Sequence, residues 1–280
     1  MKLINSDIKM AEPREDIKIV AIVPAFNEER SIQSVVKGIK TLYPNISIVV
    51  VNDGSSDRTA EKAAASGART ITLPFNLGIG GAMQTGFKIA ASEGYDIAIQ
   101  VDGDAQHNPL YIKDLVKPLC RGELDMCIGS RFLSENPTFR STFFRRIGIR
   151  IFSGLLRSLI HIRLTDPTSG FRAINRKLIR VFALNYPIDF PEPEAIKLAQ
   201  RFGARIGEVP VKMRKRLGGT SSIRYFSTIY YMVKVSLAIL IDTLRKPIGA
   251  SDERSVFCVG LFRFIASVCH RNDPPRKNDF

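Results

Sequence analysis

Residues 97–107 read I-A-I-Q-V-D-G-D-A-Q-H, and the rest of the chain is organised around this stretch. The residues before Asp102 are apolar except for Gln100, which predicts a strand, Ile97–Val101, buried on both faces of a parallel sheet. The run ends abruptly in Asp102-Gly103-Asp104. The strand therefore brings two carboxylates to the carboxyl edge of the sheet, where open α/β folds bind their ligands.

The carboxylates of Asp102 and Asp104 repel each other unless a cation lies between them. A hard divalent cation, Mg²⁺ or Mn²⁺, is held by few protein oxygens and completes its coordination with substrate phosphates. Asp102 and Asp104 are therefore candidate metal ligands, and Gln106 is a further oxygen donor in the same turn. A solvated Asp-Gly turn is the alternative interpretation. For His107 we expect an ordinary surface position.

Strands and helices alternate around this stretch, from residue 17 to about residue 130. The expected strands are 17–23, 46–51, 70–73, 97–101 and 126–129, and the expected helices are 31–42, 59–66, 78–92 and 110–119. Such alternation with short connections predicts an α/β fold with a mostly parallel central sheet flanked by helices. A short edge strand is expected over 208–213, because Pro210 is compatible with a sheet edge.

Composition and net charge limit the classes of partner that the protein is expected to bind. The chain has 280 residues, 45% of them hydrophobic and 24% charged, which describes an ordinary globular protein. Its net charge of +14 indicates a polyanionic partner: nucleic acid, an anionic membrane surface or a phosphorylated substrate. No nucleic-acid-binding signature accompanies the charge, so nucleic acid is not expected. The four cysteines have no C-x-x-C spacing, and the N-terminus lacks the apolar core of a signal peptide, which predicts a cytoplasmic protein.

The second half of the chain is basic and amphipathic. Residues 139–164 combine arginines with apolar residues at helical spacing, which fits either a core helix with a basic face or an interfacial helix that meets lipid headgroups or an acceptor phosphate. Residues 225–247 predict an amphipathic, membrane-associated helix rather than a spanning one, because Lys234 and Asp242 interrupt it. We therefore divide the chain into a flexible leader (1–16), a main domain (17–224), this helix, and a tail without an assigned role (248–280).

Several motifs together resemble glycosyltransferase family 2, whose members have the GT-A fold. They are P-A-F-N-E-E (24–29), V-N-D-G-S-S-D (51–57), N-L-G-I-G-G-A (76–82), D-G-D-A-Q-H (102–107) and G-S-R (129–131). In the second half, D-P-T-S-G-F-R (166–172) and a basic glycine-serine loop (214–222) resemble the polyprenyl-phosphate branch, the dolichyl-phosphate mannosyltransferase-like enzymes. The resemblance implies an inverting transfer from a UDP- or GDP-sugar, assisted by Mg²⁺ or Mn²⁺. The leading acceptor is undecaprenyl or dolichyl phosphate, met at the cytoplasmic face of a membrane.

The resemblance also implies roles for individual residues. Nucleotide-sugar binding is expected at the strand ends and glycine turns, at Pro24, Ala25, Asn27, Glu28, Asp53, Gly80, Asp102 and Gly103. Donor or acceptor phosphate is expected at Arg131, Arg172, Arg214, Arg216 and Ser221. The implied catalytic residues are Asp102, Asp104, Arg131 and Glu194.

A general base is needed only for some acceptors. A lipid phosphate is already an anion and needs positioning, whereas a hydroxyl must lose its proton to a carboxylate. Glu194, or Glu192, is the candidate, although P-E-P-E departs from the Glu-Asp pair of many family members. The alternative interpretation is that these two glutamates only stabilise the N-terminus of a helix, where negative charge is favourable.

Three rival functions remain open at this point. The first is transfer to a saccharide hydroxyl in cell-wall or exopolysaccharide synthesis. The second is a sugar-phosphate nucleotidyltransferase, which predicts a glycine-rich basic loop after the first strand, where residues 24–29 are acidic instead. The third is a non-catalytic nucleotide-sugar-binding module, disfavoured because both acidic strand ends are intact.

Overall fold

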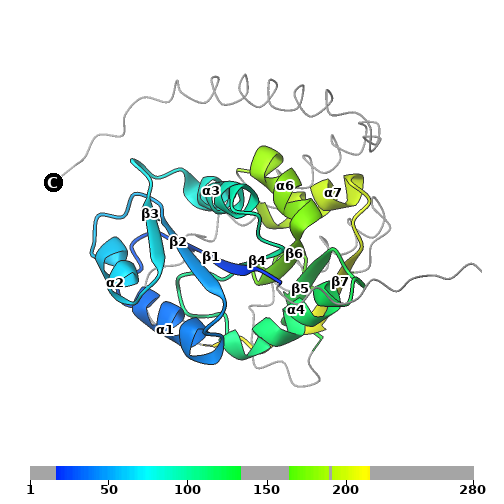
Figure 1. Ribbon diagram of the computed structural model, residues 1–280, viewed down its shortest axis with the longest axis horizontal. Coiled ribbons are helices and arrows are strands. Elements are labelled where there is room, and N and C mark those ends of the chain that lie inside the picture. The colour runs from blue at the N-terminus through cyan, green and yellow to red at the C-terminus, as the bar shows by residue number, and fades with distance from the viewer. Residues whose placement is uncertain (1–16, 134–163, 189–190, 215–280) are drawn as a thin grey trace, which may run out of the picture.

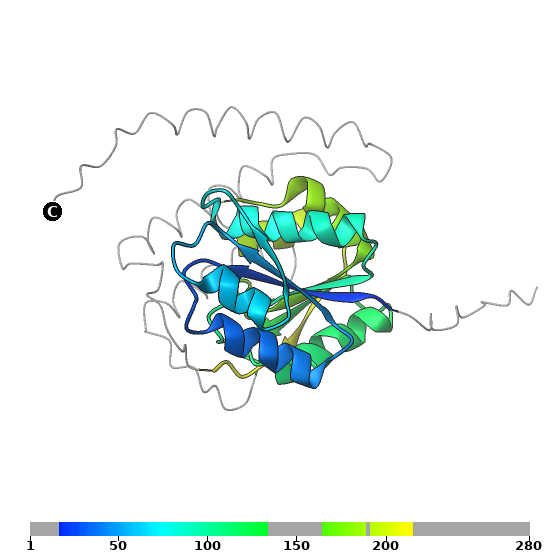
Figure 2. The same ribbon diagram turned by 60° about the vertical axis from the view of Figure 1, so that its left-hand side comes forward.

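The computed structural model describes residues 17–133, 164–188 and 191–214 (Figure 1). The expected leader, nearly all of the basic segment 139–164 and both C-terminal segments lie outside these residues, and so do Arg216 and Ser221. The described residues form one open sheet with helices on both faces (Figures 1 and 2).

The sheet has seven strands in the order β3-β2-β1-β4-β6-β5-β7. Their bounds are Ile19–Ala25 (β1), Ser47–Asn52 (β2), Arg69–Thr72 (β3), Ile97–Gln100 (β4), Met126–Ser130 (β5), Arg172–Asn175 (β6) and Ile206–Pro210 (β7). Among them, β6 runs antiparallel to its neighbours β4 and β5, and all other pairs are parallel. The expected α/β fold with a mostly parallel sheet is therefore confirmed.

The helices divide between the two faces of the sheet. Their bounds are Ile32–Leu42 (α1), Thr59–Ala65 (α2), Gly78–Ser92 (α3), Ile112–Cys120 (α4), Arg176–Asn185 (α6) and Pro191–Arg201 (α7). Helices α1, α2 and α4 cover one face, and α3, α6 and α7 cover the other (Figure 1). Successive residues of β1 enter opposite cores, since Ala21 and Val23 pack on the first face and Val20 and Ile22 on the second. This is why the strand is apolar throughout.

Several segments differ from the expectation. The expected helix 110–119 begins instead with a 3-10 turn, Pro109–Tyr111, because the Asn108 side chain accepts a hydrogen bond from the Leu110 amide and turns the chain before α4. The strand β6 and helix α6 were not expected from the sequence. The edge strand β7 ends at Pro210 and begins two residues before the expected start, so the edge position of this proline is confirmed.

The packing of α3 on β1 generates a stability prediction. A Cβ atom at Gly86 would lie 2.2 Å from Cγ2 of Ile22, so Gly86→Ala is expected to destabilise the fold by about 1–3 kcal/mol through overpacking. Gly38 in α1 is the matched control, since its Cβ would meet Pro109 at an ordinary 3.4 Å. Gly38→Ala is expected to stabilise by about 0.5–1 kcal/mol. Urea unfolding of both variants measures the difference, and equal midpoints would contradict this account of the packing.

Candidate active site

The carboxyl ends of β1 and β4 meet where the strand order reverses. The Val101 amide donates to the Ile22 carbonyl at 3.0 Å, and the Gly103 amide donates to the Pro24 carbonyl at 3.3 Å. A Cβ at Gly103 would lie 3.1 Å from that carbonyl oxygen and 3.3 Å from Cβ of Ala25, so glycine permits this close approach. Pro24, Ala25, Asp102 and Gly103 are thus brought together at the switch point, where open α/β sheets bind ligands.

Asp53 follows β2 at the same edge of the sheet. Its amide donates to the Ala25 carbonyl at 2.9 Å, and its carboxylate accepts the Leu77 amide at 2.7 Å, at the start of α3. Burial raises the pKa of Asp53, while the hydrogen bonds from the Leu77 and Gly78 amides oppose that rise. The carboxylate therefore ties the glycine turn of α3 to the end of β2.

The loops after β1 and β2 are hydrogen-bonded to each other. Asn27, which has a positive φ of 54°, donates its amide to the Ser55 hydroxyl and accepts the Ser56 amide, both at 2.9 Å. The Glu28 amide donates to the Thr59 hydroxyl at 2.8 Å. Asn27 and Glu28 thus hold the loops after β1 and β2 together at the carboxyl edge of the sheet.

Gly80, expected at a nucleotide-sugar site, lies close to the backbone of another part of the protein. A Cβ at this position would lie 2.3 Å from the Ile188 carbonyl oxygen and 2.4 Å from that of Pro187. The glycine therefore accounts for the packing of the segment after α6 against α3, and this contact explains the residue without a nucleotide.

The acidic turn itself holds Asp104 by local hydrogen bonds. Its carboxylate accepts the Gln106 amide at 3.0 Å and the Gln106 side-chain nitrogen at 2.7 Å. That arrangement leaves the side-chain oxygen of Gln106 as the atom suited to a cation. Ala105 adopts a positive φ of 64°, which turns the chain back sharply between the two.

The donor set fits a hard divalent cation that shares its coordination with a substrate. The described residues contain no group of three or more His, Cys, Asp or Glu side chains able to hold a metal. Asp102 and Asp104 offer carboxylate oxygens from one turn, without a surrounding all-protein cage. Mg²⁺ is bound in this manner, through one or two carboxylates with phosphate oxygens completing the shell.

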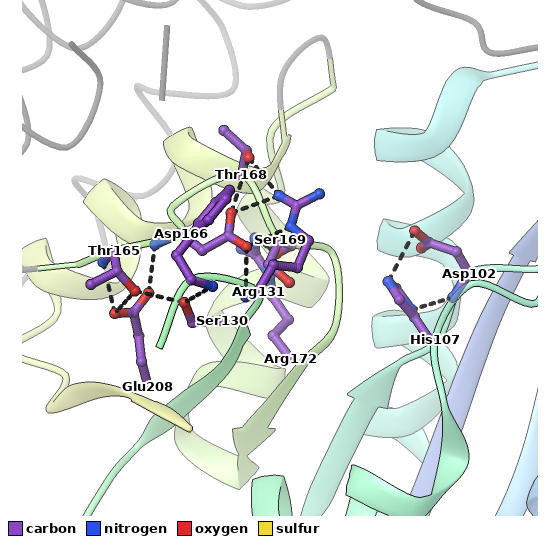
Figure 3. A network of polar contacts seen from close by, with 11 residues as sticks. Asp102, His107, Ser130, Arg131, Thr165, Asp166, Thr168, Ser169, Arg172 and Glu208 are labelled. Atoms are coloured by element: carbon purple, nitrogen blue, oxygen red, sulfur yellow. Dashed lines mark hydrogen bonds and ion pairs between the residues drawn. The ribbon is translucent and has the colours of Figure 1, made fainter. Parts of the chain in front are cut away.

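A buried ion pair joins the residue after β5 to the chain before β6 (Figure 3). Both Nε and Nη2 of Arg131 donate to the carboxylate of Asp166 at 2.6 Å, and Nη2 also donates to the Thr168 hydroxyl at 2.9 Å. Asp166 is fully buried. Burial alone would lower the pKa of Arg131, but the hydrogen bonds and charge of Asp166 raise it overall. Arg131 is therefore a fixed cation at the edge of the sheet.

Glu208 anchors the chain just before that pair. Its carboxylate accepts the Thr165 and Asp166 amides at 2.7 and 2.8 Å, which joins this turn to β7 (Figure 3). Burial raises the pKa of Glu208, and the Thr165 and Asp166 amides oppose the rise. The predicted edge strand thus carries an acid that the sequence did not single out.

The position of the Arg172 side chain differs from the expectation of direct phosphate binding. Its side chain is 1% exposed and donates to the backbone carbonyls of Ser169 and, at 3.0 Å, Glu192. A guanidinium buried in this way joins the start of β6 to α7. We therefore assign Arg172 a role in holding the site together.

Glu192 and Glu194 lie in the first turn of α7. Burial raises the pKa of Glu192, with the charge of Asp102 adding to the rise and the charges of Arg172 and Arg131 opposing it. Glu192 is therefore within electrostatic reach of the acidic turn. Glu192 therefore stands beside Glu194 as a candidate for the general base.

His107 is not the surface residue expected from the sequence. It is 5% exposed, its ring stacks on Phe171 with centroids 4.7 Å apart, and its Nδ1 accepts the Asp102 amide at 3.0 Å (Figure 3). A histidine two residues after a polar turn carries no local signal of burial, so only the tertiary fold reveals this contact.

Arg214 reaches the acidic turn from the far edge of the sheet. Its amide donates to the Gln106 carbonyl at 2.8 Å, and its side chain is exposed. Of the expected phosphate-binding cations, Arg131 and Arg214 are thus near the acidic pair.

An open α/β sheet with an acidic pair at its switch point defines the chain as a nucleotide-binding type of enzyme fold. The model of the family "Glycosyl transferase family 2" matches residues 20–182, more than half of the chain, and the protein belongs to this family. It is a glycosyltransferase, which sets aside the nucleotidyltransferase and non-catalytic alternatives.

Relatives and solved structures agree with this assignment. The chain is 28% identical over 251 residues to a UDP-N-acetylglucosamine–dolichyl-phosphate N-acetylglucosaminyltransferase of Methanococcus voltae, covering 81% of this chain and 99% of that protein. It is 30% identical over 233 residues to a dolichol-phosphate mannosyltransferase of Pyrococcus furiosus, covering 78% and 64%. The fold is similar, with a TM-score of 0.60, to glucosyl-3-phosphoglycerate synthase of Mycobacterium tuberculosis in complex with Mn²⁺, UDP and glucosyl-3-phosphoglycerate. That match has 25% identity and covers 81% of this chain and 79% of the other.

The buried ion pair generates a second stability prediction. Asp166→Asn leaves a buried guanidinium without its counter-charge, and the expected loss in the free energy of unfolding is about 3–5 kcal/mol. The double variant Arg131→Met/Asp166→Leu is expected to lose less than the two single changes together, as a double-mutant cycle would measure. Arg205→Met, which breaks a pair whose arginine is 58% exposed, is the control and is expected to lose much less. Strict additivity at 131 and 166 would overturn the assignment.

Proposed function

We propose that this glycosyltransferase transfers a sugar from a UDP- or GDP-sugar to a polyprenyl phosphate, with inversion at the anomeric carbon. The observation that carries the proposal is the hydrogen bond from the Arg214 amide to the Gln106 carbonyl. It joins an exposed arginine, at the start of a basic stretch, to the turn that carries the acidic pair. An anionic acceptor entering between them would meet a cation on one side and the donor on the other.

Independent features favour a lipid-phosphate acceptor. Two relatives described above are dolichyl-phosphate sugar transferases by name. The net charge of +14 suits an anionic membrane surface. Phe75, Leu77 and Ile79 are exposed in and just after the connection from β3 to α3, at the carboxyl edge of the sheet. Such apolar side chains at the mouth of a site are expected where a long hydrocarbon chain must approach.

The proposed mechanism assigns a separate task to each part of the site. Asp102 and Asp104, with the side-chain oxygen of Gln106, would hold Mg²⁺ or Mn²⁺. When bound, the ion neutralises charge on the departing nucleoside diphosphate. Arg131, fixed by Asp166, adds a preorganised positive charge that needs no rearrangement during the reaction. Pro24, Ala25 and Gly103 would line the nucleotide side of the crevice.

The acceptor decides whether a proton must move. A lipid phosphate oxygen attacks the anomeric carbon as an anion, so binding it in line with the leaving group is the main requirement. Transfer to a saccharide hydroxyl is the second candidate function, and the raised pKa of Glu192 favours it because a base is most effective near the working pH.

We propose that the enzyme works at the cytoplasmic face of a membrane. Within residues 17–133, 164–188 and 191–214, no helix is both long and apolar enough to cross a bilayer. The amphipathic segment 225–247, predicted from the sequence, remains the proposed membrane contact.

Arg214 provides the test of the lipid-phosphate proposal. Nucleoside diphosphate release is followed with Mn²⁺, a UDP- or GDP-sugar, and either polyprenyl phosphate or a saccharide. Release should require polyprenyl phosphate and disappear in Asp104→Ala, whereas Asp114→Ala, an exposed acid of α4, should retain it. Arg214→Gln should raise KM for the lipid phosphate by about tenfold through the lost charge contact, while Lys212→Gln, also exposed, should not. Release with saccharides alone would refute the proposal.

Glu192 separates the two acceptor classes. With polyprenyl phosphate, Glu192→Gln is expected to lower kcat by less than about tenfold, since no proton is removed. With a hydroxyl acceptor the loss should reach about 10²–10⁴-fold. Burial raises the pKa of Glu192, so its protonated, inactive form persists to higher pH than that of an ordinary glutamate. As the pH is lowered, the rate of hydroxyl transfer should therefore begin to fall at a higher pH than it would with an ordinary glutamate as the base. A pH profile of kcat/KM for both proteins measures this, and an unchanged profile in Glu192→Gln would exclude the base role.

A further inference from the structure

The backbone amide of Asp102 has no strand partner. The amides of Val101 and Gly103, on either side of it, both point to β1. Since successive amides of an extended chain point in opposite directions, the Asp102 amide faces away from β1, towards the side occupied by β6. The last residue pair between β4 and β6 is Gln100 with Arg172, so the ladder has ended before Asp102.

His107 takes the place of the missing strand. Its Nδ1 accepts the Asp102 amide at 3.0 Å, and the left-handed Ala105 lets the turn fold back far enough for this contact. Stacking on the buried Phe171, with ring planes 13° apart, holds the imidazole in position. Because the amide is the donor, Nδ1 is unprotonated and the ring proton lies on Nε2.

The same imidazole also flanks the carboxylate of Asp102. Nε2 of His107 lies 3.5 Å from Oδ2, and the side-chain nitrogen of Gln100 lies 3.3 Å from Oδ1. Gly170 closes a further side, since a Cβ there would lie 3.1 Å from Oδ2. The carboxylate of Asp102 is thus confined by its neighbours.

We infer that His107 is a positioning residue that fixes Asp102 in the orientation needed to bind the divalent cation and the donor diphosphate. This inference rests on the proposed metal-binding role of Asp102. The shorter contact, at Nδ1, identifies the hydrogen bond to the backbone as the main link, with Nε2 as a weaker second contact. Residues that orient a metal ligand in this way typically change metal affinity by about 10–100-fold when they are replaced.

Three substitutions separate the two contacts of the imidazole. In His107→Asn, the side-chain oxygen occupies roughly the position of Nδ1 and can still accept the Asp102 amide. In His107→Gln, the amide nitrogen reaches the position of Nε2, but nothing accepts the backbone N–H. His107→Leu removes both contacts and keeps an apolar side chain beside Phe171. Leu178→Ala, in the core on the opposite face of the sheet, is the control for lost stability without a change near Asp102.

The test measures Mn²⁺ binding to the full-length protein in the presence of UDP, and of GDP in a second series, together with Tm and transfer kinetics. His107→Leu is expected to weaken Mn²⁺ binding at least tenfold, with much of the lost rate recovered at high Mn²⁺. His107→Asn should restore most of the affinity, and His107→Gln less. Leu178→Ala should lower Tm and leave Mn²⁺ affinity within about twofold.

Two results would overturn the inference while leaving the proposed function intact. The first is wild-type Mn²⁺ affinity in His107→Leu, and the second is an Asn variant that binds Mn²⁺ no better than the Leu variant. A wild-type protein that binds no Mn²⁺ with either nucleotide would instead refute the metal role of Asp102, and the inference with it. The Asn and Gln variants keep the comparison decisive if His107→Leu does not fold.

Discussion

The reversal of strand order between β1 and β4 is the constraint on which the rest of the site depends. Chain leaving β1 turns towards β2, whereas chain leaving β4 turns towards the other half of the sheet, so the two loops diverge. The strands nevertheless remain in contact at their ends, through the Gly103 amide and the Pro24 carbonyl. A residue with a side chain at 103 would separate them. The acidic turn is thus held close to the first loop by backbone contacts, and the surrounding side chains adjust it.

Positive and negative side chains alternate around the ends of β1 and β4. Asp166 fixes Arg131, and backbone carbonyls bind the Arg172 guanidinium. Glu192 lies within electrostatic reach of both arginines, and Asp102 lies within that of Arg131. Buried cations lessen the repulsion between neighbouring carboxylates before any metal arrives. The same burial makes each charge expensive to leave without a partner, which is why the pairs are closely hydrogen-bonded.

Local sequence patterns predicted the features that depend on local structure. Apolar runs ending in acidic turns predicted that Asp53, Asp102 and Asp104 follow strands, and the expected helix Gly78–Ser92 has the observed bounds. The sequence did not reveal β6, because four residues after a polar turn carry little periodic signal. The burial of His107 and the contacts of Arg172 were missed for another reason. Each depends on a contact with chain distant in sequence or folded back by an unusual turn, and such contacts leave no mark on spacing or composition.

The connection between β5 and β6 leaves and re-enters the sheet at one place. The hydroxyls of Ser130 and Thr165 are 2.6 Å apart, and the Arg131–Asp166 pair follows immediately on both strands of the connection. The contacts at residues 130–131 and 165–166 thus join the two sides of this connection before residues 134–163 begin. The cost of closing such a loop grows only slowly with its length. Residues 130–131 and 165–166 are therefore natural boundaries for chimeras in which the intervening segment is exchanged between family members.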